Sequence, residues 1–574
     1  MNGHNMNAKT ASLQASRAWK TQFSLDFAGE LVVDLFAGGG GASTGLEMGL
    51  NRPVDIAINH DPDAISMHEI NHPGATHYQS DVFEVDPLLA TKGQPVGHFH
   101  ASPDCTHHSQ ARGGQPRKKA IRSLSWVVHK WAGKVRPRVI TLENVEAMLD
   151  WSPLQAKRCK TSGRVVKVDG MVARPGERVP LQEQFLVPDK RRKGHNWQHF
   201  VQGLRDMGYE VQWRTLRAKD YGAPTRRERL FLIARCDGQP ITWPEPTHAL
   251  PEARHGRKLP AKGQQLLHHR SAADCMDWSI PVRSVFTRKR PLAAATQRRI
   301  ARGLSRFVLN CGEPFILPIA NWSAGEVVHS IQEPLRTITA WPRGGSFSVV
   351  APTMIQVGYG ERKGQSPRCL DLHKPLGTVV AGGVKHALCM GFMAQMNGGY
   401  NETPGHHLKK PMSTICGRGT QQQLVTAQMA RVAPCSALPH TSGQPAHRQR
   451  IDGPLQPTIQ AMALQTADFL IRNGGADASP CASIEDKLKL VTIYHQEDTF
   501  LLVDIGLRML EPRELYRAQG FPDSYVIDRG HDGRKLTKTA QTRMVGNSVS
   551  PLPMAAIVRA NHSVSQVAEK VGAA

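Results

Sequence analysis

Residues 31–41 read Leu-Val-Val-Asp-Leu-Phe-Ala-Gly-Gly-Gly-Gly, and this stretch decides the fold class of the 574-residue chain. A short β-branched apolar run passes directly into four glycines, and residues 43–48 continue with a helical pattern. Strand, glycine turn and helix form the opening of a doubly wound α/β sheet, which binds nucleotide-like ligands at the carboxyl ends of its strands. The stretch therefore predicts a Rossmann-like domain with a ligand crevice beside the turn.

Other segments continue or interrupt this pattern. We expect further strands at residues 54–58, 137–142, 210–216 and 230–234. A hairpin with an Asp169-Gly170 turn, ending in a basic run at residues 190–193, interrupts the α/β alternation. The predicted division is a polar tail at 1–30, an α/β domain at 31–245 with a basic hairpin insertion at 151–195, a Pro- and Gly-rich region at 246–500, and a C-terminal segment at 501–574 that returns to the α/β domain.

The formal net charge of +24 bounds the class of partner. Such a charge indicates a polyanion, most commonly nucleic acid, and a generally solubilising surface is the alternative. The ten cysteines include no C-x-x-C pair, which is typical of reduced thiols in the cytoplasm. No apolar run approaches 18 residues, and residues 1–30 show no signal-peptide pattern, so we expect no membrane association.

The Pro- and Gly-rich region contains an internal repeat. Pro-Leu-x-Thr-(Ile/Val) or a close variant begins at Pro334, Pro375, Pro411 and Pro454, separated by 41, 36 and 43 positions, and residues 489–493 are a worn fifth copy. A period near 40 with Asn-Gly-Gly turns and β-branched residues predicts repeated β units. A plain β scaffold in which no copy binds anything remains an alternative.

Two segments carry candidate chemistry. Asp34 precedes the glycine turn, and a carboxylate in the crevice repels pyrophosphate but suits a sulfonium and an ammonium group, which favours S-adenosylmethionine over a dinucleotide. Cys105 lies in the polar loop Ser-Pro-Asp-Cys-Thr-His-His-Ser at residues 102–109. Nine Lys and Arg and no acid lie between Cys105 and Leu142, a charge pattern that favours a thiolate and also binds phosphates; an ordinary basic helix face is the alternative.

Six motifs occur in a fixed order and carry a family resemblance. They are Asp-Leu-Phe-Ala-Gly at 34–38, Pro-Asp-Cys at 103–105, Glu-Asn-Val at 143–145, Arg-Glu-Arg at 227–229, Arg-Glu-Leu-Tyr-Arg-Ala-Gln-Gly-Phe-Pro at 513–522 and Gly-Asn-Ser-Val at 546–549. This series resembles the ordered motif set of the cytosine-C5 DNA methyltransferases, and the enlarged variable region resembles that of some bacterial and phage members. The resemblance covers residues 31–150, 197–236 and 505–560.

The resemblance implies a mechanism and its residues. Cys105 would attack C6 of a cytosine turned out of the duplex, which makes C5 nucleophilic enough to accept a methyl group. Glu143 would hydrogen-bond the base edge and supply positive character at N3. Arg227 and Arg229 would orient the ring and Glu143. The alternative is that both arginines only form a surface ion pair with Glu228.

The resemblance also assigns ligand contacts. S-adenosylmethionine would be held by the glycine turn, by the ends of the second and third strands and by the late Asn-Ser motif, with Phe36 against the adenine: Asp34, Phe36, Ala37, Gly38, Gly40, Gly41, Asn59, His60, Asp61, Asp81, Val82, Asn547 and Ser548. Duplex DNA would contact a closing loop and a basic helix in the 246–500 target-recognition region, through Ser109, Arg112, Lys118, Arg298 and Arg302. No metal is expected, because the paired histidines lack ligand spacing.

Several departures keep other readings open. Asn59 stands where the family usually has an acid, for which Asp61 could substitute, and Asp104, Thr106 and Thr225 replace a proline and two glutamines. A catalytically impaired DNA-binding relative and a tRNA-directed member are therefore alternatives. The resemblance implies a monomeric protein of the bacterial cytoplasm or nucleoid, or of the host cytoplasm for a phage protein, without stable contact to a cognate restriction endonuclease.

Overall fold

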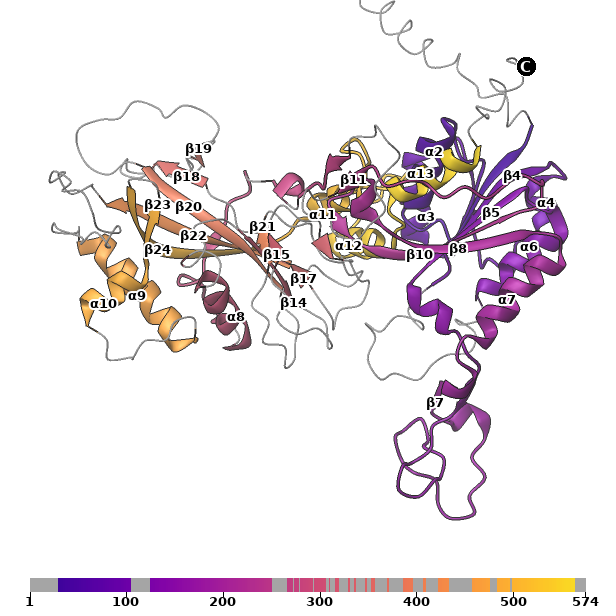
Figure 1. The fold of residues 1–574 in the computed structure, drawn as a ribbon, viewed down its shortest axis with the longest axis horizontal. Coiled ribbons are helices and arrows are strands. Elements are labelled where there is room, and N and C mark those ends of the chain that lie inside the picture. The colour runs from indigo at the N-terminus through magenta and orange to yellow at the C-terminus, as the bar shows by residue number, and fades with distance from the viewer. Residues whose placement is uncertain are drawn as a thin grey trace, which may run out of the picture.

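The computed structural model describes residues 29–104, 124–249, 266–309, 457–474, 483–495 and 498–562, apart from a few positions inside these ranges, and the backbone of strands between residues 315 and 432. Figure 1 shows two lobes, each built on a β-sheet, with helices α11 (Pro512–Gln519) and α12 (Lys538–Asn547) between them.

The first lobe contains a seven-stranded sheet of order β3-β2-β1-β4-β5-β10-β8. β1, β2, β3, β4 and β5 are parallel, whereas β10 runs antiparallel to both β5 and β8. The carboxyl ends of the parallel strands therefore meet at one edge. The strands are β1 (Leu31–Leu35), β2 (Ile56–Asn59), β3 (Thr76–Gln79), β4 (Val96–Ala101), β5 (Val139–Asn144), β8 (Glu210–Arg217) and β10 (Glu228–Arg235).

Helices cover both faces of this sheet, which confirms the predicted doubly wound class. On one face Leu46 of α2 (Gly41–Leu50) and Val558 of α13 (Pro551–His562) are fully buried in one core. On the other, Trp131 of α6 (Val127–Val135) and Phe200 of α7 (His195–Asp206) are fully buried in a second core. The remaining helices are α3 (Pro62–Asn71), α4 (Pro87–Thr91), η4 (Leu124–Trp126), η5 (Glu146–Asp150) and η8 (Ala218–Tyr221).

The second lobe is an 11-stranded, mainly antiparallel sheet with three helices. Its centre is β24-β22-β20, and α9 packs against β24 to bury Leu470 and Leu501. This agrees with the predicted largely β region. The elements are β13 (Arg283–Ser284), α8 (Ala294–Leu304), β14 (Phe315–Ile319), β15 (His329–Ser330), β17 (Ser346–Phe347), β18 (Thr353–Gln356), β19 (Cys369–Leu370), β20 (His386–Gln395), β21 (His406–Leu408), β22 (Gln422–Val432), α9 (Pro457–Arg472), α10 (Ile484–Leu490), β23 (Thr492–His495) and β24 (Asp498–Met509).

The predicted repeat lies mostly outside the described residues, but its later copies correct the expectation of uniform β units. β20 and β22 each begin 11 residues after a repeat proline, Pro375 and Pro411, and they pair with each other. The fourth copy instead becomes helical, because Pro457 opens α9 at the first helical position, where its fixed φ suits a helix. The fifth copy spans the end of α10 and the start of β23.

Among the described residues, a short strand pair and the chain after β24 connect the two lobes. β9 (Thr225–Arg226), just before Arg227, pairs with β16 (Leu335–Arg336) from the first repeat copy. β24 belongs to the second sheet as far as Met509, so the chain returns to the first lobe after that residue and not at residue 501 as expected. Shorter elements near this junction are β11 (His248–Ala249), β12 (Leu267–His268) and η9 (Ala273–Cys275).

The expected basic hairpin insertion forms an arm that projects away from both lobes (Figure 1). Its base is the antiparallel pair β6 (Leu154–Ala156) and β7 (Leu186–Pro188), flanked by η6 (Leu181–Glu183) and η7 (Lys190–Arg192). Asp169 Oδ1 accepts a hydrogen bond from Met171 N at 2.8 Å, which closes the turn that the Asp-Gly pair predicts. Among the described residues, no helix is both long enough and apolar enough to span a membrane.

A buried histidine group under α13 gives the first testable prediction. His98 Nδ1 lies 2.8 Å from His562 Nε2, and both His98 and His100 lie 2.9 Å from Thr141 Oγ1. Burial lowers the pKa of His100 and of His562 to about 3, and it holds the pKa of His98 well below its usual range. Each histidine therefore stays neutral in the folded state but binds a proton in the unfolded state below pH ~6.5.

We expect the free energy of unfolding to fall as the pH drops below ~6.5, by about 1.4 kcal/mol per pH unit for each of these histidines. Asp34, whose pKa burial raises to about 7, acts with the opposite sign, so the histidines dominate by number. Urea unfolding between pH 7.5 and 5.5 measures the slope. His562→Gln removes one titrating group and should flatten it; an unchanged slope would contradict the assignment.

Candidate active site

The glycine turn lies at the carboxyl end of β1. Part of its backbone takes left-handed conformations, which cost little energy where the residue is glycine. Gly38 and Gly40 have φ of 53° and 85°, and Phe36 also has a positive φ of 65°. Such angles are routine only for glycine. Ala37 N donates to Ile58 O at 3.1 Å, so the turn lies against the end of β2.

The glycines of the turn differ in what surrounds them. A Cβ at Gly38 would meet only Phe36 O at 3.7 Å, so this side of the turn is open to a ligand. A Cβ at Gly40 would lie 2.0 Å from Tyr525 Oη, and one at Gly41 would lie 1.9 Å from Ser548 Oγ. We expected Gly40 and Gly41 to admit a ligand; instead they admit the C-terminal segment, and only Gly38 leaves room for a bound molecule.

Tyr525 ties that C-terminal segment to the turn. Its hydroxyl donates to Gly39 O at 2.7 Å and lies 3.3 Å from His72 Nε2. His72 Nδ1 in turn lies 2.9 Å from Glu47 Oε1 of α2. Tyr525 and His72 are buried, and burial holds the pKa of Tyr525 well above its usual range, so the phenol keeps its proton and stays a donor. The sequence alone predicted no role for Tyr525 or His72.

Gly41→Ala should therefore destabilise the contact between the glycine turn and the C-terminal segment. The added methyl would overlap Ser548 Oγ and the Val549 carbonyl oxygen, which lies 2.2 Å from the Cβ position. We expect a loss of about 1–3 kcal/mol of unfolding free energy, measured by urea titration. The matched control is Gly133→Ala in α6, where the nearest atom is Met207 Sδ at 3.9 Å and alanine should be neutral or stabilising. Equal effects of the two changes would argue against this packing.

Asp34 differs from the expectation of a carboxylate pointing into the crevice. Its side chain is fully buried against α2, where Ser43 Oγ donates to Oδ2 at 2.6 Å. His68 Nε2 lies 2.8 Å from the same Ser43 oxygen. Burial raises the pKa of Asp34 to about 7, against the lowering effect of Ser43. Asp34 therefore bonds to α2 through Oδ2, its Oδ1 has no hydrogen-bond partner among the described residues, and its contact with a cofactor stays a prediction.

The other predicted cofactor residues lie along the same edge. Asn59 ends β2 and its Oδ1 accepts from Asp61 N at 2.9 Å; His60 is exposed. Asp61 caps α3, and it pairs with Arg543, which together with the cap outweighs burial and lowers its pKa. Both oxygens of Asp61 thus already have partners in the protein, and its substitution for Asn59 stays a prediction. Asp81, Val82 and Asn547 lie at loop and helix ends, with Asp81 and Asn547 exposed and Val82 buried.

Glu143 and two arginines form a buried charged group at the carboxyl end of β5. Glu143 Oε1 lies 3.2 Å from Arg229 Nε and 3.9 Å from Arg227 Nη2. All three side chains are less than 9% exposed. Burial raises the pKa of Glu143 and the two arginines lower it, with a raised value as the net result. The sequence predicted that the two arginines lie beside Glu143, and their burial argues against the alternative of a surface ion pair.

The segment that carries Cys105, Ser109, Arg112 and Lys118 lies outside the described residues, but its starting point is fixed. Asn144 Nδ2 donates to Pro103 O at 3.0 Å, and Ser102 N donates to Leu35 O at 3.2 Å. The chain therefore enters residues 105–123 at the end of β4, between the glycine turn on β1 and Glu143 on β5. Arg227 Nη1 donates to Gly546 O at 3.1 Å, which joins the late motif to the same site. Thr225, one of the departures, holds the Arg227 backbone through its Oγ1 at 3.2 Å.

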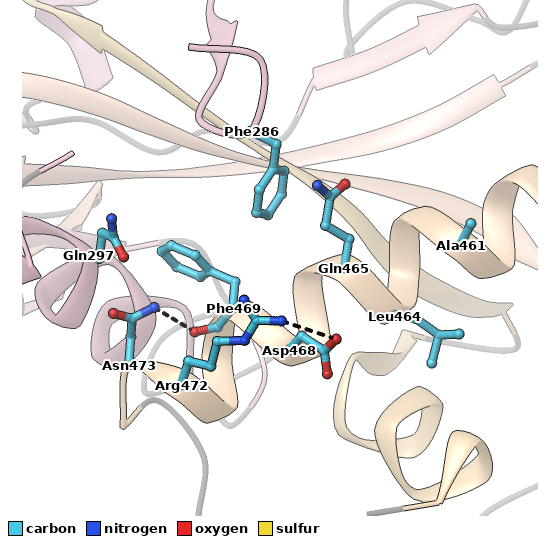
Figure 2. Close-up of a pocket in the computed structure, with 9 residues that line it drawn as sticks. All are labelled: Phe286, Gln297, Ala461, Leu464, Gln465, Asp468, Phe469, Arg472 and Asn473. Atoms are coloured by element: carbon cyan, nitrogen blue, oxygen red, sulfur yellow. Dashed lines mark hydrogen bonds and ion pairs between the residues drawn. The ribbon is translucent and has the colours of Figure 1, made fainter. Parts of the chain in front are cut away.

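The candidate nucleic-acid residues of the second lobe lie on α8, where Arg298 is exposed and Arg302 is partly buried. A cavity of about 560 Å³ opens nearby between α8 and α9. Figure 2 shows its lining, in which Arg472 pairs with Asp468 at 3.6 Å and Asn473 donates to Phe469 O at 2.8 Å. All the lining residues belong to the second lobe, so the cavity is separate from the candidate active site.

The chain is similar to known proteins over the segments that form the candidate active site. The family model for C-5 cytosine-specific DNA methylases matches residues 31–156, 187–274 and 410–562, more than half of the chain. The type II methyltransferase M.AquIA of Picosynechococcus sp. is 21% identical over 43% of this chain and 87% of its own length. M.AgeI of Thalassovita gelatinovora is 27% identical over 38% of this chain and 42% of its own length.

Two solved structures are also similar. A Spodoptera frugiperda DNMT2 mutant is 13% identical with a TM-score of 0.41, and covers 92% of this chain and 97% of its own. A putative prophage DNA modification methyltransferase from E. coli is 15% identical with a TM-score of 0.35, and covers 93% of this chain and 98% of its own.

Proposed function

The chain belongs to the C-5 cytosine-specific DNA methylases, and from this premise we propose that it transfers a methyl group from S-adenosylmethionine to C5 of a cytosine in a specific duplex sequence. The observation that carries the proposal is the buried Glu143–Arg229 pair at the edge where the glycine turn ends and the Cys105 segment begins. A buried acid, a glycine turn with an open side, and a neighbouring strand end that leads into the Cys105 segment suit methyl transfer to a polar ring.

The first lobe offers the groups that a methyl donor needs. The open side of Gly38 accommodates a ligand against the backbone, with Phe36 beside it for an adenine ring and Asn59 at the end of β2 for ribose hydroxyls. Asp81, Val82, Asn547 and Ser548 would complete the pocket. S-adenosylmethionine, when bound, would supply an electrophilic methyl group.

Cys105 supplies the nucleophile in this proposal. Its thiolate would bond to C6 of the everted cytosine and make C5 an enamine-like carbon. Methyl transfer to C5 would release S-adenosylhomocysteine. The C5 proton would then leave to a solvent base, the C6–sulfur bond would break and N3 would return its proton to the Glu143 carboxylate, which restores the ring, the acid and the thiolate. The basic residues that follow Cys105 favour the thiolate by charge.

Glu143 would donate a proton to N3 of the cytosine as negative charge enters the ring. Burial raises the pKa of Glu143 and so favours its protonated form, while Arg229 and Arg227 keep the carboxyl group oriented. Arg227 and Arg229 would also balance the charge of the Glu143 carboxylate after transfer.

The second lobe would choose the sequence. Arg298 on α8 would contact phosphate, with Arg302 on the same helix, and the closing loop would add Ser109, Arg112 and Lys118. The pairing of β9 with β16 connects the first repeat copy to the two residues that precede Arg227, so the second lobe would contact the backbone next to the proposed catalytic arginines.

The test is methylation of mixed-sequence duplex DNA with tritiated S-adenosylmethionine. We expect incorporation at a few sites, none with Cys105→Ser, and retained duplex binding by that variant. Labelling that tRNA competes away better than duplex DNA would replace the DNA-directed activity with a tRNA-directed one. Duplex binding without incorporation by the unaltered protein would indicate a relative that has lost catalysis.

A further inference from the structure

The arm at residues 154–193, here called the basic arm, has no role in the site described above. It leaves the first lobe after Asn144 and η5, at the carboxyl edge of the sheet where Glu143 lies, and α7 then returns to the opposite edge. The family model stops at residue 156 and resumes at residue 187. Nearly all of the arm beyond its base is therefore an addition of this chain to the family pattern.

The basic arm has its own backbone hydrogen bonds and a small buried core. Beyond the β6–β7 pair, Lys157 N donates to Phe185 O at 2.7 Å, Phe185 N to Val166 O at 2.9 Å and Ala173 N to Val165 O at 2.8 Å. Val166, Ala173 and Val179 are buried inside it, and Lys157 Nζ lies 4.8 Å from the centre of the Phe185 ring. Cross-connected backbone and a small core hold its surface side chains at fixed positions.

Its surface is strongly basic. Eleven Lys and Arg face four Asp and Glu between residues 154 and 193. Three basic groups are neutralised by ion pairs, Lys167 with Glu177, Arg192 with Asp189 and Lys193 with Asp150. Lys160, Arg178 and Arg191 are exposed, and each makes no ion pair within the part of the chain that the structure describes.

We propose that the basic arm binds the phosphate backbone of duplex DNA that flanks the target cytosine. This inference rests on the proposed function, because that function puts a duplex against the carboxyl edge from which the arm projects. Unpaired cations at fixed positions beside that edge match a polyanion whose charges are regularly spaced. The exposed Val168 and Met171 at the Asp169-Gly170 turn give the arm an apolar tip, which suits the wall of a groove.

The first test shortens the arm without disturbing its base. Ala156 and Leu186 are paired across β6 and β7, so Asn-Gly can replace residues 157–185 as a two-residue hairpin turn. We expect duplex affinity to fall about tenfold at low salt, and binding to depend less on duplex length between about 14 and about 40 base pairs. Fluorescence anisotropy with labelled duplexes measures both.

A charge variant guards against misfolding of the shortened protein. Lys160→Gln, Arg178→Gln and Arg191→Gln together should make the slope of log affinity against log salt shallower by about 2 to 3. The matched control is Lys92→Gln, Arg136→Gln and Arg205→Gln. These three exposed residues lie at the C-terminal ends of α4, α6 and α7, before β4, β5 and β8 at the opposite edge of the sheet, and should leave the slope unchanged.

The outcomes separate the arm from the activity. A charge variant with the salt slope of the unaltered protein overturns the proposal, as does a shortened protein that binds long and short duplexes as the unaltered protein does. Failure of the unaltered protein to incorporate tritium would refute the proposed function, whereas the salt slope tests the arm by binding alone.

Discussion

We expect Glu143→Gln to lower kcat for methyl transfer by about 10²–10⁴-fold while duplex binding persists. Glutamine keeps the size and one hydrogen bond of the side chain, but it cannot transfer a proton to the cytosine ring. The effect is large because Glu143 is buried with a raised pKa and is aimed by Arg229 at 3.2 Å. Single-turnover incorporation of tritium measures the chemical step directly.

Two controls make the Glu143 result specific. Glu146→Gln changes an exposed acid three residues along the same segment and should leave kcat within about twofold. Thermal unfolding of Glu143→Gln, followed by assays well below its Tm, separates lost chemistry from lost structure, because removing the acid leaves two buried arginines without their counter-charge. Turnover by Glu143→Gln at the unaltered rate would remove Glu143 from the mechanism.

Glu514→Ala should be the most destabilising single change in the junction between the lobes. Glu514 is fully buried, and Arg508 donates to its two oxygens at 2.8 and 2.9 Å. It also accepts from Asp277 N at 2.9 Å and from Glu511 N at 2.7 Å. One side chain thus joins α11, β24 and the segment after η9, and its loss leaves a buried guanidinium unpaired. We expect a cost of about 3–5 kcal/mol in unfolding free energy.

Urea unfolding with two comparison variants tests this cost. Glu485→Ala removes an exposed acid from α10 and should cost no more than about 0.5 kcal/mol. Arg508→Leu combined with Glu514→Leu removes both charges and should cost less than Glu514→Ala alone, because no unpaired charge remains. A loss below about 1 kcal/mol for Glu514→Ala would show that the pair is dispensable.

The sequence predicts the first lobe well because its signals are local. A β-branched run followed by four glycines fixes β1, the turn and α2, and the motif order places Glu143 and Arg229 on neighbouring strand ends. Periodicity cannot show which way a buried polar side chain turns. Asp34 therefore reads as a crevice residue although its Oδ2 accepts a hydrogen bond from Ser43 of α2.

Long-range packing limits the rest of the prediction. Tyr525 meets Gly39 across 486 positions, and no single-sequence pattern connects them. Gly40 and Gly41 read as ligand-facing, because a glycine that admits another chain segment looks the same in sequence as one that admits a ligand. The fourth repeat copy matches the others over a few residues, but Pro457 and the helix-forming residues that follow it set its structure. β24 is continuous with the motif segment in sequence, and only its pairing with β22 assigns it to the second sheet.

The central claim is that Cys105 forms a covalent bond to the target cytosine, and a trapping measurement tests it most directly. Mixed-sequence duplexes carrying 5-fluorocytosine, incubated with the protein and S-adenosylmethionine, should yield a stable adduct, because fluorine at C5 blocks the final elimination. Mass spectrometry of peptides from the adduct should place the DNA on Cys105, and Cys105→Ser should form none. An adduct on Cys159, whose thiol has a pKa lowered to about 7 by hydrogen bonding with Ser162, or no adduct with a methylating protein, would contradict the account.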